Sequence, residues 1–200
     1  MDKYKGKYRI DSTRAPFWDY RSESAYFVTI CTKNRIHFFG EISDGKMILS
    51  DIGKIVESEW LKTFDMRPDM NLGMGEFVVM PNHFHAVISI GKNEYNSPGK
   101  AQCIPDVETQ CIASPHQEES PKNKFGPQSK NLASIIRGFK TGVTVNARAL
   151  GQNNVLPVFA WQSRYHDHII RNEKELDRIS NYIRNNPAKW EQDRLKHQAK

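Results

Sequence analysis

The spacing of apolar and polar residues predicts short strands that alternate with amphipathic helices. Residues 25–32 alternate between the two classes and are rich in β-branched and aromatic side chains, as expected of a half-buried strand. A Ser-Asp-Gly turn at 43–45 separates two short runs, which indicates a β-hairpin. Pro81 and Asn82 mark a break in another apolar run. The predicted strands cover residues 25–32, 37–42, 46–49, 77–90 and 159–170.

Three other segments repeat apolar residues every three or four positions, which is the spacing of amphipathic helices. The first begins with Ser50 or Asp51 as its N-cap, and the third begins near Asn172. The second covers residues 132–150. The apolar stripes of the first two helices are Ile52, Ile55, Val56, Trp60 and Phe64, then Leu132, Ile135, Ile136, Phe139, Val143 and Leu150. This order predicts an α+β fold of the ferredoxin-like type, an antiparallel sheet with helices packed on one face.

The length of 200 residues suits one domain with a substantial core. Residues 91–130 carry five prolines and no sustained periodicity, so we expect a flexible insert there. We therefore divide the chain into a basic, aromatic N-terminal segment at 1–20, a folded domain at 21–190 that contains the insert, and a C-terminal tail at 191–200.

Positive charge and aromatic rings are concentrated near the start of the chain. The net charge of +6 and the pI of about 9.2 favour a polyanionic partner. Interleaved cations and rings suit single-stranded nucleic acid, because its bases stack on rings while its backbone follows positive charge. A solvated tail with a few rings packed on the domain is the alternative. The residues are Lys3, Lys5, Lys7, Arg9, Arg14 and Arg21, among Tyr4, Tyr8, Phe17, Trp18 and Tyr20.

The composition predicts neither a membrane segment nor export. Hydrophobic residues make up 38% of the chain, its mean hydropathy is −0.67, and no apolar run approaches the roughly 20 residues of a membrane span. The first 14 residues lack the pattern of a signal peptide, and the three cysteines form no disulfide framework. We expect a soluble cytoplasmic protein that is nucleoid-associated when it is bound to DNA.

The most informative short motif is a pair of histidines separated by one apolar residue, at His83 and His85. Side chains of a strand alternate between its faces, so both imidazoles leave the same face while Phe84 leaves the other. Two imidazoles on one face can hold one metal ion. The alternative is a half-buried strand whose polar face carries two histidines. A second pair, His166 and His168, is interpreted as strand or DNA-contact residues, with a metal role as the alternative.

Taken together and in order, several motifs resemble those of the single-tyrosine transposases of the HUH endonuclease superfamily, and most closely the branch of REP-associated tyrosine transposases. The resemblance spans roughly residues 20–190 apart from the insert. Its motifs are Tyr26-Phe27-Val28-Thr29, Phe77-Val78-Val79-Met80-Pro81-Asn82 before His83-Phe84-His85, Arg137-Gly138-Phe139-Lys140, Phe159-Ala160-Trp161-Gln162-Ser163-Arg164-Tyr165 with His168, and Tyr182-Ile183-Arg184-Asn185-Asn186-Pro187.

The resemblance implies a metal-dependent single-stranded DNA endonuclease and strand transferase that acts in transposition and DNA recombination. Tyr182 matches the nucleophile, which forms a 5′-phosphotyrosine, and the metal ligands match His83, His85 and Asn186. Residues four apart on a helix share a face, although Pro187 is expected to push Asn186 out of the α region. The expected partner is single-stranded DNA that forms hairpins. The candidate DNA contacts are Arg9, Arg14, Arg21, Arg137, Lys140, Arg164, His168 and Arg184.

Two imidazoles and one amide oxygen, without cysteine, favour Mg²⁺ or Mn²⁺ as the cofactor. Two other functions stay open. One is a catalytically silent relative that binds single-stranded nucleic acid on its sheet, and the other is a metal hydrolase in which water replaces the tyrosine. The sequence also leaves open whether the protein is a monomer or a homodimer, and whether Tyr182 serves its own site or that of a partner.

Overall fold

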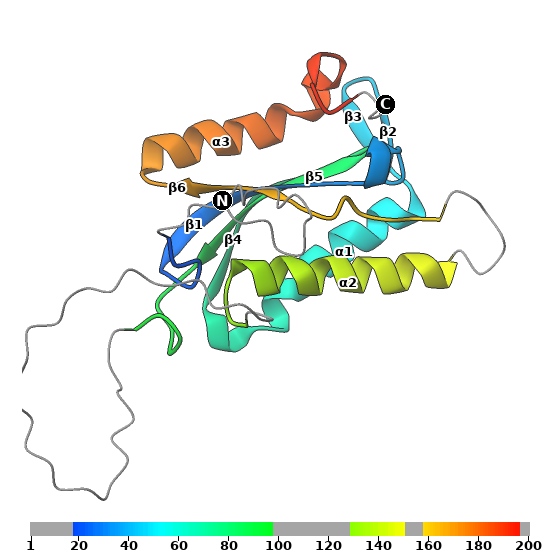
Figure 1. The fold of residues 1–200 in the computed structure, drawn as a ribbon. Coiled ribbons are helices and arrows are strands. Elements are labelled where there is room, and N and C mark those ends of the chain that lie inside the picture. The colour runs from blue at the N-terminus through cyan, green and yellow to red at the C-terminus, as the bar shows by residue number, and fades with distance from the viewer. Residues whose placement is uncertain (1–17, 98–128, 151–157, 197–200) are drawn as a thin grey trace, which may run out of the picture.

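The structure, a computed structural model, describes residues 18–97, 129–150 and 158–196 (Figure 1). The first 17 residues, most of the insert, and the candidate contacts Arg9 and Arg14 lie outside the described residues. Within the described part of the chain, no helix has the length and apolar character needed to cross a membrane.

A four-stranded antiparallel sheet forms the centre of the domain, with the strand order β4-β5-β1-β6. A separate two-stranded hairpin, β2 and β3, confirms the predicted turn, with positive φ angles at Asp44 and Gly45. The strands are β1 (Ser24–Cys31), β2 (Gly40–Ser43), β3 (Lys46–Leu49), β4 (Leu72–Met80), β5 (His83–Ile90) and β6 (His166–Ile170).

The segment predicted at 77–90, with a break at Pro81 and Asn82, is a tight hairpin of two strands rather than one interrupted strand. β4 ends at Met80 and β5 begins at His83, and these two residues pair across a turn formed by Pro81 and Asn82. Proline cannot donate a hydrogen bond inside a sheet, so the chain reverses at this point. The first half of β4 was missed because two glycines weaken its strand pattern and the pairing shifts between Met74 and Phe77.

The three predicted helices are present as α1 (Asp51–Asp65), α2 (Leu132–Leu150) and α3 (Glu173–Asn185). Ser50 caps α1 by accepting a hydrogen bond from the Gly53 amide, and Asn172 caps α3 by accepting one from the Glu175 amide. A short 3₁₀ helix, η5 (Pro187–Gln192), follows α3. The helices form a sandwich around the sheet, with α1 and α2 on one face and α3 on the other (Figure 1).

Both faces of the sheet are therefore buried, which corrects the expectation that all helices pack on one face. The larger core lies beneath α1 and α2, where Trp60 contacts the rings of Phe84 and Phe139 at centroid distances of 5.0 and 5.3 Å. A smaller core beneath α3 consists of Val87, Ile170, Ile179 and Ile183. The predicted burial of Leu150 is wrong: its side chain is 52% exposed, and Ala147 is the last buried residue of α2.

The last predicted strand is also shorter than expected, since only residues 166–170 of 159–170 form a ladder with β1. The segment before it is held by backbone bonds on either side of Thr32 and by an isolated bridge from Thr32 to Trp161. Phe159 and Trp161 pack into the larger core, which holds this irregular segment beside the sheet.

The ends of the insert lie far from the histidine pair. Tyr95, before the undescribed part, donates a hydrogen bond to the Asp69 carboxylate at 2.9 Å, and Lys130, after it, forms an ion pair with the same carboxylate. Both ends lie beyond Ile90, at the opposite end of β5 from His83. Eight residues of strand span about 25 Å, so these anchors do not border the histidines.

Candidate active site

His83 and His85 lie on the α3 face of β5, as the alternation of the strand predicts. Their ring centroids are 4.6 Å apart, and both side chains are buried. In the adjacent strand β1, Cys31 pairs with His83 and Thr29 pairs with His85. The two imidazoles therefore lie side by side on one face of β5, beneath α3.

The hydrogen bonds of Asn82 determine which nitrogen of His83 carries its proton. The Asn82 amide group donates to the Arg35 and Leu195 carbonyl oxygens, at 3.1 and 2.7 Å, so the other end of the side chain must be the acceptor. That oxygen lies 2.8 Å from Nδ1 of His83, which must therefore carry the hydrogen. Nε2 of His83 is left with a lone pair that faces the site, the orientation required of a metal ligand.

His85 is held between a strand and a helix. Its Nδ1 lies 2.8 Å from the Thr29 hydroxyl, and its Nε2 lies 3.3 Å from the Tyr182 hydroxyl. The Phe27 ring stacks on the imidazole at a centroid distance of 5.3 Å. These contacts restrict the rotation of the ring and keep Nε2 directed toward α3.

Both imidazoles are neutral near pH 7. Burial lowers the pKa of His85 to about 3, with a smaller contribution from His166. Burial also lowers the pKa of His83 well below its ordinary value, and neighbouring His85 adds to the effect. Neutral imidazole is the form that ligates metals, so no proton has to be displaced from either ring.

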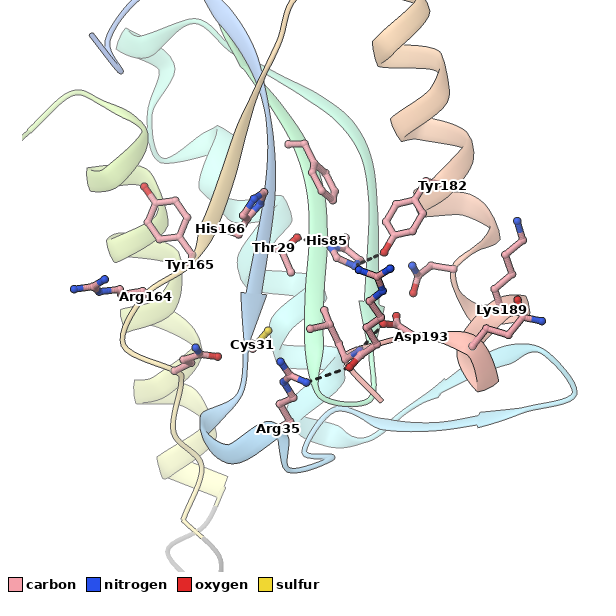
Figure 2. Close-up of a pocket in the computed structure, with 16 residues that line it drawn as sticks. Thr29, Cys31, Arg35, His85, Arg164, Tyr165, His166, Tyr182, Lys189 and Asp193 are labelled. Atoms are coloured by element: carbon pink, nitrogen blue, oxygen red, sulfur yellow. Dashed lines mark hydrogen bonds between the residues drawn. The ribbon is translucent and has the colours of Figure 1, made fainter. Parts of the chain in front are cut away.

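Tyr182 reaches the histidines from α3, whose Ile179 and Ile183 anchor the helix on the sheet. Its ring is 46% exposed and its hydroxyl faces His85, as Figure 2 shows. Burial and the Asp193 carboxylate raise the pKa of Tyr182, while a hydrogen bond from Asn186 lowers it. The tyrosine is therefore a neutral phenol in the resting protein.

Asn186 lies one turn beyond Tyr182 and is buried in the same pocket. The expectation that Pro187 would push it out of the α region is wrong, since its φ and ψ angles are −60° and −44°. The chain tightens directly into η5, so Asn186 keeps helical geometry at the junction. Its amide oxygen is buried without a hydrogen-bond partner.

Asp193 is a site residue that the sequence reasoning missed. One of its carboxylate oxygens lies 3.6 Å from Nε2 of His83, and potential ligand atoms of Asp193, His83 and His85 all lie within 4.8 Å of one another. The residues after it are held by hydrogen bonds from Asn82 to the Leu195 carbonyl and from Arg35 to the Arg194 carbonyl. A segment assigned to the tail thus lies against the histidines.

The donor atoms at this point fit a divalent cation. Among the described residues, four buried side-chain polar atoms lack a hydrogen-bond partner, and three of them belong to His83, Asn186 and Asp193. Unpaired buried polar atoms are costly, and those of His83 and Asp193 lie 3.6 Å apart, so this pair indicates a partner that accepts lone pairs. Imidazole nitrogens together with carboxylate and amide oxygens form a set of this kind for Mg²⁺, Mn²⁺ or Zn²⁺.

A pocket of about 770 Å³ is lined by His85, Tyr182, Asn186 and Asp193, among others. Figure 2 shows Tyr182, His85 and Asp193 on one side of it and Arg164 and Tyr165 on the other. His166 lies between them on β6, so this histidine lines the pocket as well. The cationic residues of its lining are Arg35, Arg164, Lys189 and Arg194.

The candidate DNA contacts are spread over the surface, and only some lie beside the pocket. Arg164 lines it, and Arg137 and Lys140 lie on α2. Three others already have acidic partners: Arg21 pairs with Asp19, His168 with Glu175, and Arg184 with Glu76. Two aromatic residues near the start of the chain pack on the folded domain. Trp18 donates a hydrogen bond to the Tyr26 hydroxyl, and the Tyr20 ring stacks on the Tyr26 ring.

Comparison with known proteins finds a relative in sequence and solved structures with a similar fold. No family profile matches the chain. An uncharacterized protein of Haemophilus influenzae is 38% identical over 184 residues, which cover 92% of this chain and 91% of the relative. A REP-associated tyrosine transposase solved with a REP hairpin superposes with a TM-score of 0.53 at 19% identity, covering 90% of this chain and 74% of that one. The chain therefore belongs to the same family as the Haemophilus influenzae protein and has the fold of the REP-associated tyrosine transposase.

Proposed function

We propose that this protein is a metal-dependent single-stranded DNA endonuclease and strand transferase of the transposase type, with Tyr182 as its nucleophile. The observation that carries the proposal is the position of the Tyr182 hydroxyl, 3.3 Å from His85 and in one pocket with the unpartnered atoms of Asn186 and Asp193. The likeness in fold to a transposase that binds a DNA hairpin supports a nucleic-acid substrate for this pocket.

In this function the Tyr182 oxygen attacks a phosphodiester in line with the leaving 3′-oxygen. The new bond joins the tyrosine oxygen to the 5′-phosphate, and the broken bond releases a 3′-hydroxyl. The phenol loses one proton and the leaving 3′-oxygen takes up one, so there is no net release of protons. Rejoining reverses these steps, so the phosphodiester bond is conserved without ATP. Arg35, Arg164, Lys189 and Arg194 line the pocket and orient the DNA backbone by charge.

His83, His85 and Asp193, together with Asn186, would hold the divalent ion. When bound, such an ion would withdraw charge from the scissile phosphate, which would compensate for a nucleophile with a pKa near or above about 10. The carboxylate of Asp193 adds a negative charge to an otherwise neutral donor set, and this favours Mg²⁺ or Mn²⁺.

A catalytically silent nucleic-acid-binding relative would not require a tyrosine hydroxyl directed at a buried histidine. A metal hydrolase that uses water would not require it either. The contact between Tyr182 and His85 therefore favours the covalent mechanism over both alternatives.

The direct test is incubation of the full chain with labelled DNA and Mn²⁺. We expect a covalent protein–DNA adduct with single-stranded DNA that carries a hairpin, and little cleavage of the same sequence as a perfect duplex, because paired strands cannot bring the scissile phosphate in line within the pocket. Denaturing gel electrophoresis measures both products. Equal cleavage of duplex and single strand without an adduct would point to an ordinary metal nuclease, and binding without cleavage to a silent relative.

Asn82 provides a second test of the proposed metal site. The change Asn82→Ala removes the acceptor that holds the His83 proton on Nδ1, so we expect about 10- to 100-fold weaker Mn²⁺ binding by calorimetry. Asn185→Ala is the matched control, since that exposed amide donates only to the Asn181 carbonyl in the described contacts. Because Asn82 is buried, thermal unfolding should establish that the variant is folded; unchanged Mn²⁺ affinity in a folded variant would contradict the assignment.

A further inference from the structure

A second cavity, of about 560 Å³, lies between α2 and the irregular segment that precedes β6. We call it the α2 groove. One wall is formed by α2 and the other by residues 160–165. Its lining residues are Ile136, Arg137, Lys140, Thr141, Thr144 and Arg148 on the helix, with Ala160, Trp161, Ser163 and Tyr165 opposite.

The charge of the α2 groove suits an extended polyanion. Arg137, Thr141, Thr144 and Arg148 follow one another at intervals of four, three and four, so they lie along one face of the helix. Neither α2 nor residues 158–165 contain an aspartate or a glutamate. The two arginines lie at either end of this face and can bind phosphate oxygens. The Thr141 and Thr144 hydroxyls between them donate to the Arg137 and Lys140 carbonyl oxygens.

The floor of the groove is held rigidly. Lys140 donates to the Gln162 carbonyl at 2.7 Å, and the Trp161 indole donates to the Lys140 carbonyl at 3.1 Å. The Lys140 ammonium lies 5.9 Å from the centre of the Trp161 ring. These contacts join helix and segment at two points, so the Lys140 side chain does not have to be ordered when a ligand arrives.

The α2 groove adjoins the candidate active-site pocket. Tyr165 lines both cavities, and Gln162, whose carbonyl accepts from Lys140, also lines the pocket. β6 is an edge strand, so no further strand separates the two openings. A chain that leaves the pocket beside Arg164 passes over Tyr165 into the groove, along the side of the pocket opposite Tyr182 (Figure 2).

We propose that the α2 groove binds the backbone of the same DNA single strand that enters the active site, a few nucleotides away from the phosphate that is cut. This inference rests on the proposed function. The path turns around the edge of the sheet, and double-stranded DNA, with a persistence length of about 150 base pairs, is too stiff for that turn. A single strand bends freely and can stack a base on Tyr165 or Trp161.

The test compares oligothymidylates of about 4 to 16 nucleotides by fluorescence anisotropy, with the full chain and no added metal. A short oligonucleotide fills the pocket alone, and a longer one reaches the groove. In the wild-type chain we expect affinity to rise with length. In the double variant Arg137→Ala, Arg148→Ala, the gain in affinity with length should fall by about 25-fold at 0.1 M salt. Each lost phosphate contact to a single strand reduces the salt slope by about 0.7, and this variant loses two of them.

The matched control is Lys174→Ala with Arg178→Ala, which removes the same charge from the exposed side of α3, outside both cavities. Its length dependence should equal that of the wild type. The proposed role of the α2 groove would be overturned if affinity still rose with length in the groove variant, or if both variants lost the length dependence equally. Failure of the wild-type chain to bind any of the oligonucleotides would instead contradict the proposed function itself.

Discussion

Replacement of Tyr182 by phenylalanine should abolish the covalent protein–DNA adduct and leave DNA binding almost unchanged. The substitution removes only the attacking oxygen, while the ring keeps its edge contact with Phe27 at a centroid distance of 6.2 Å. Loss of a nucleophile that forms a covalent intermediate lowers turnover by at least about 10³-fold. Denaturing gels measure the adduct, and fluorescence anisotropy with a labelled hairpin measures binding.

Tyr165→Phe is the matched control for this experiment, because Tyr165 is the other tyrosine that lines the pocket in the described part of the chain. It should retain the adduct. The loss of one hydrogen bond from Tyr182 to His85 alters stability by only about 1 kcal/mol, so Tyr182→Phe should remain folded, and thermal unfolding checks both variants. An adduct that persists in Tyr182→Phe and disappears in Tyr165→Phe would move the nucleophile to Tyr165.

The parts of the site that were predictable from sequence are those set by local periodicity. His83 and His85 share a face because strand side chains alternate, and that holds whichever strands lie beside them. Ser50 and Asn172 mark the starts of helices because their side chains cap backbone amides. Tyr182 and Asn186 come together because they lie one helical turn apart.

The remaining features depend on contacts between distant segments, which no local pattern encodes. Asp193 reaches His83 only because carbonyls of its own segment accept hydrogen bonds from Asn82 and Arg35, more than a hundred residues earlier. In the sequence it is one acidic residue in a polar segment. A faint signal was available: Trp190, four residues after Asn186, is an apolar residue that is buried and packs toward His83.

The position of α3 was obscured for a related reason. β5 is buried on both faces, but the face beneath α3 carries His83, His85 and Ser89, so in the sequence it resembles a solvent-facing side of a strand. Periodicity does not reveal that such a strand is covered twice. The second layer, α3, carries Tyr182, the proposed nucleophile, so the wrong layer arrangement concerned the helix that completes the candidate site.

Replacement of His83 by alanine should remove metal binding and cleavage together, while leaving metal-free DNA binding in place. His83 contributes a fixed Nε2 lone pair, and its loss takes away one nitrogen of a donor set that includes His85 and Asp193. At a Mn²⁺ concentration 100 times the dissociation constant, the wild-type chain should gain about 2.7 kcal/mol of stability, and the variant should gain almost none. Calorimetry and Mn²⁺-dependent thermal unfolding measure the two effects.

His168→Ala serves as the control, because that imidazole bonds to Glu175 and does not line the pocket. If His83→Ala bound Mn²⁺ as tightly as His168→Ala, the ion would have to be held elsewhere, and the buried unpaired atoms of Asn186 and Asp193 would need another partner.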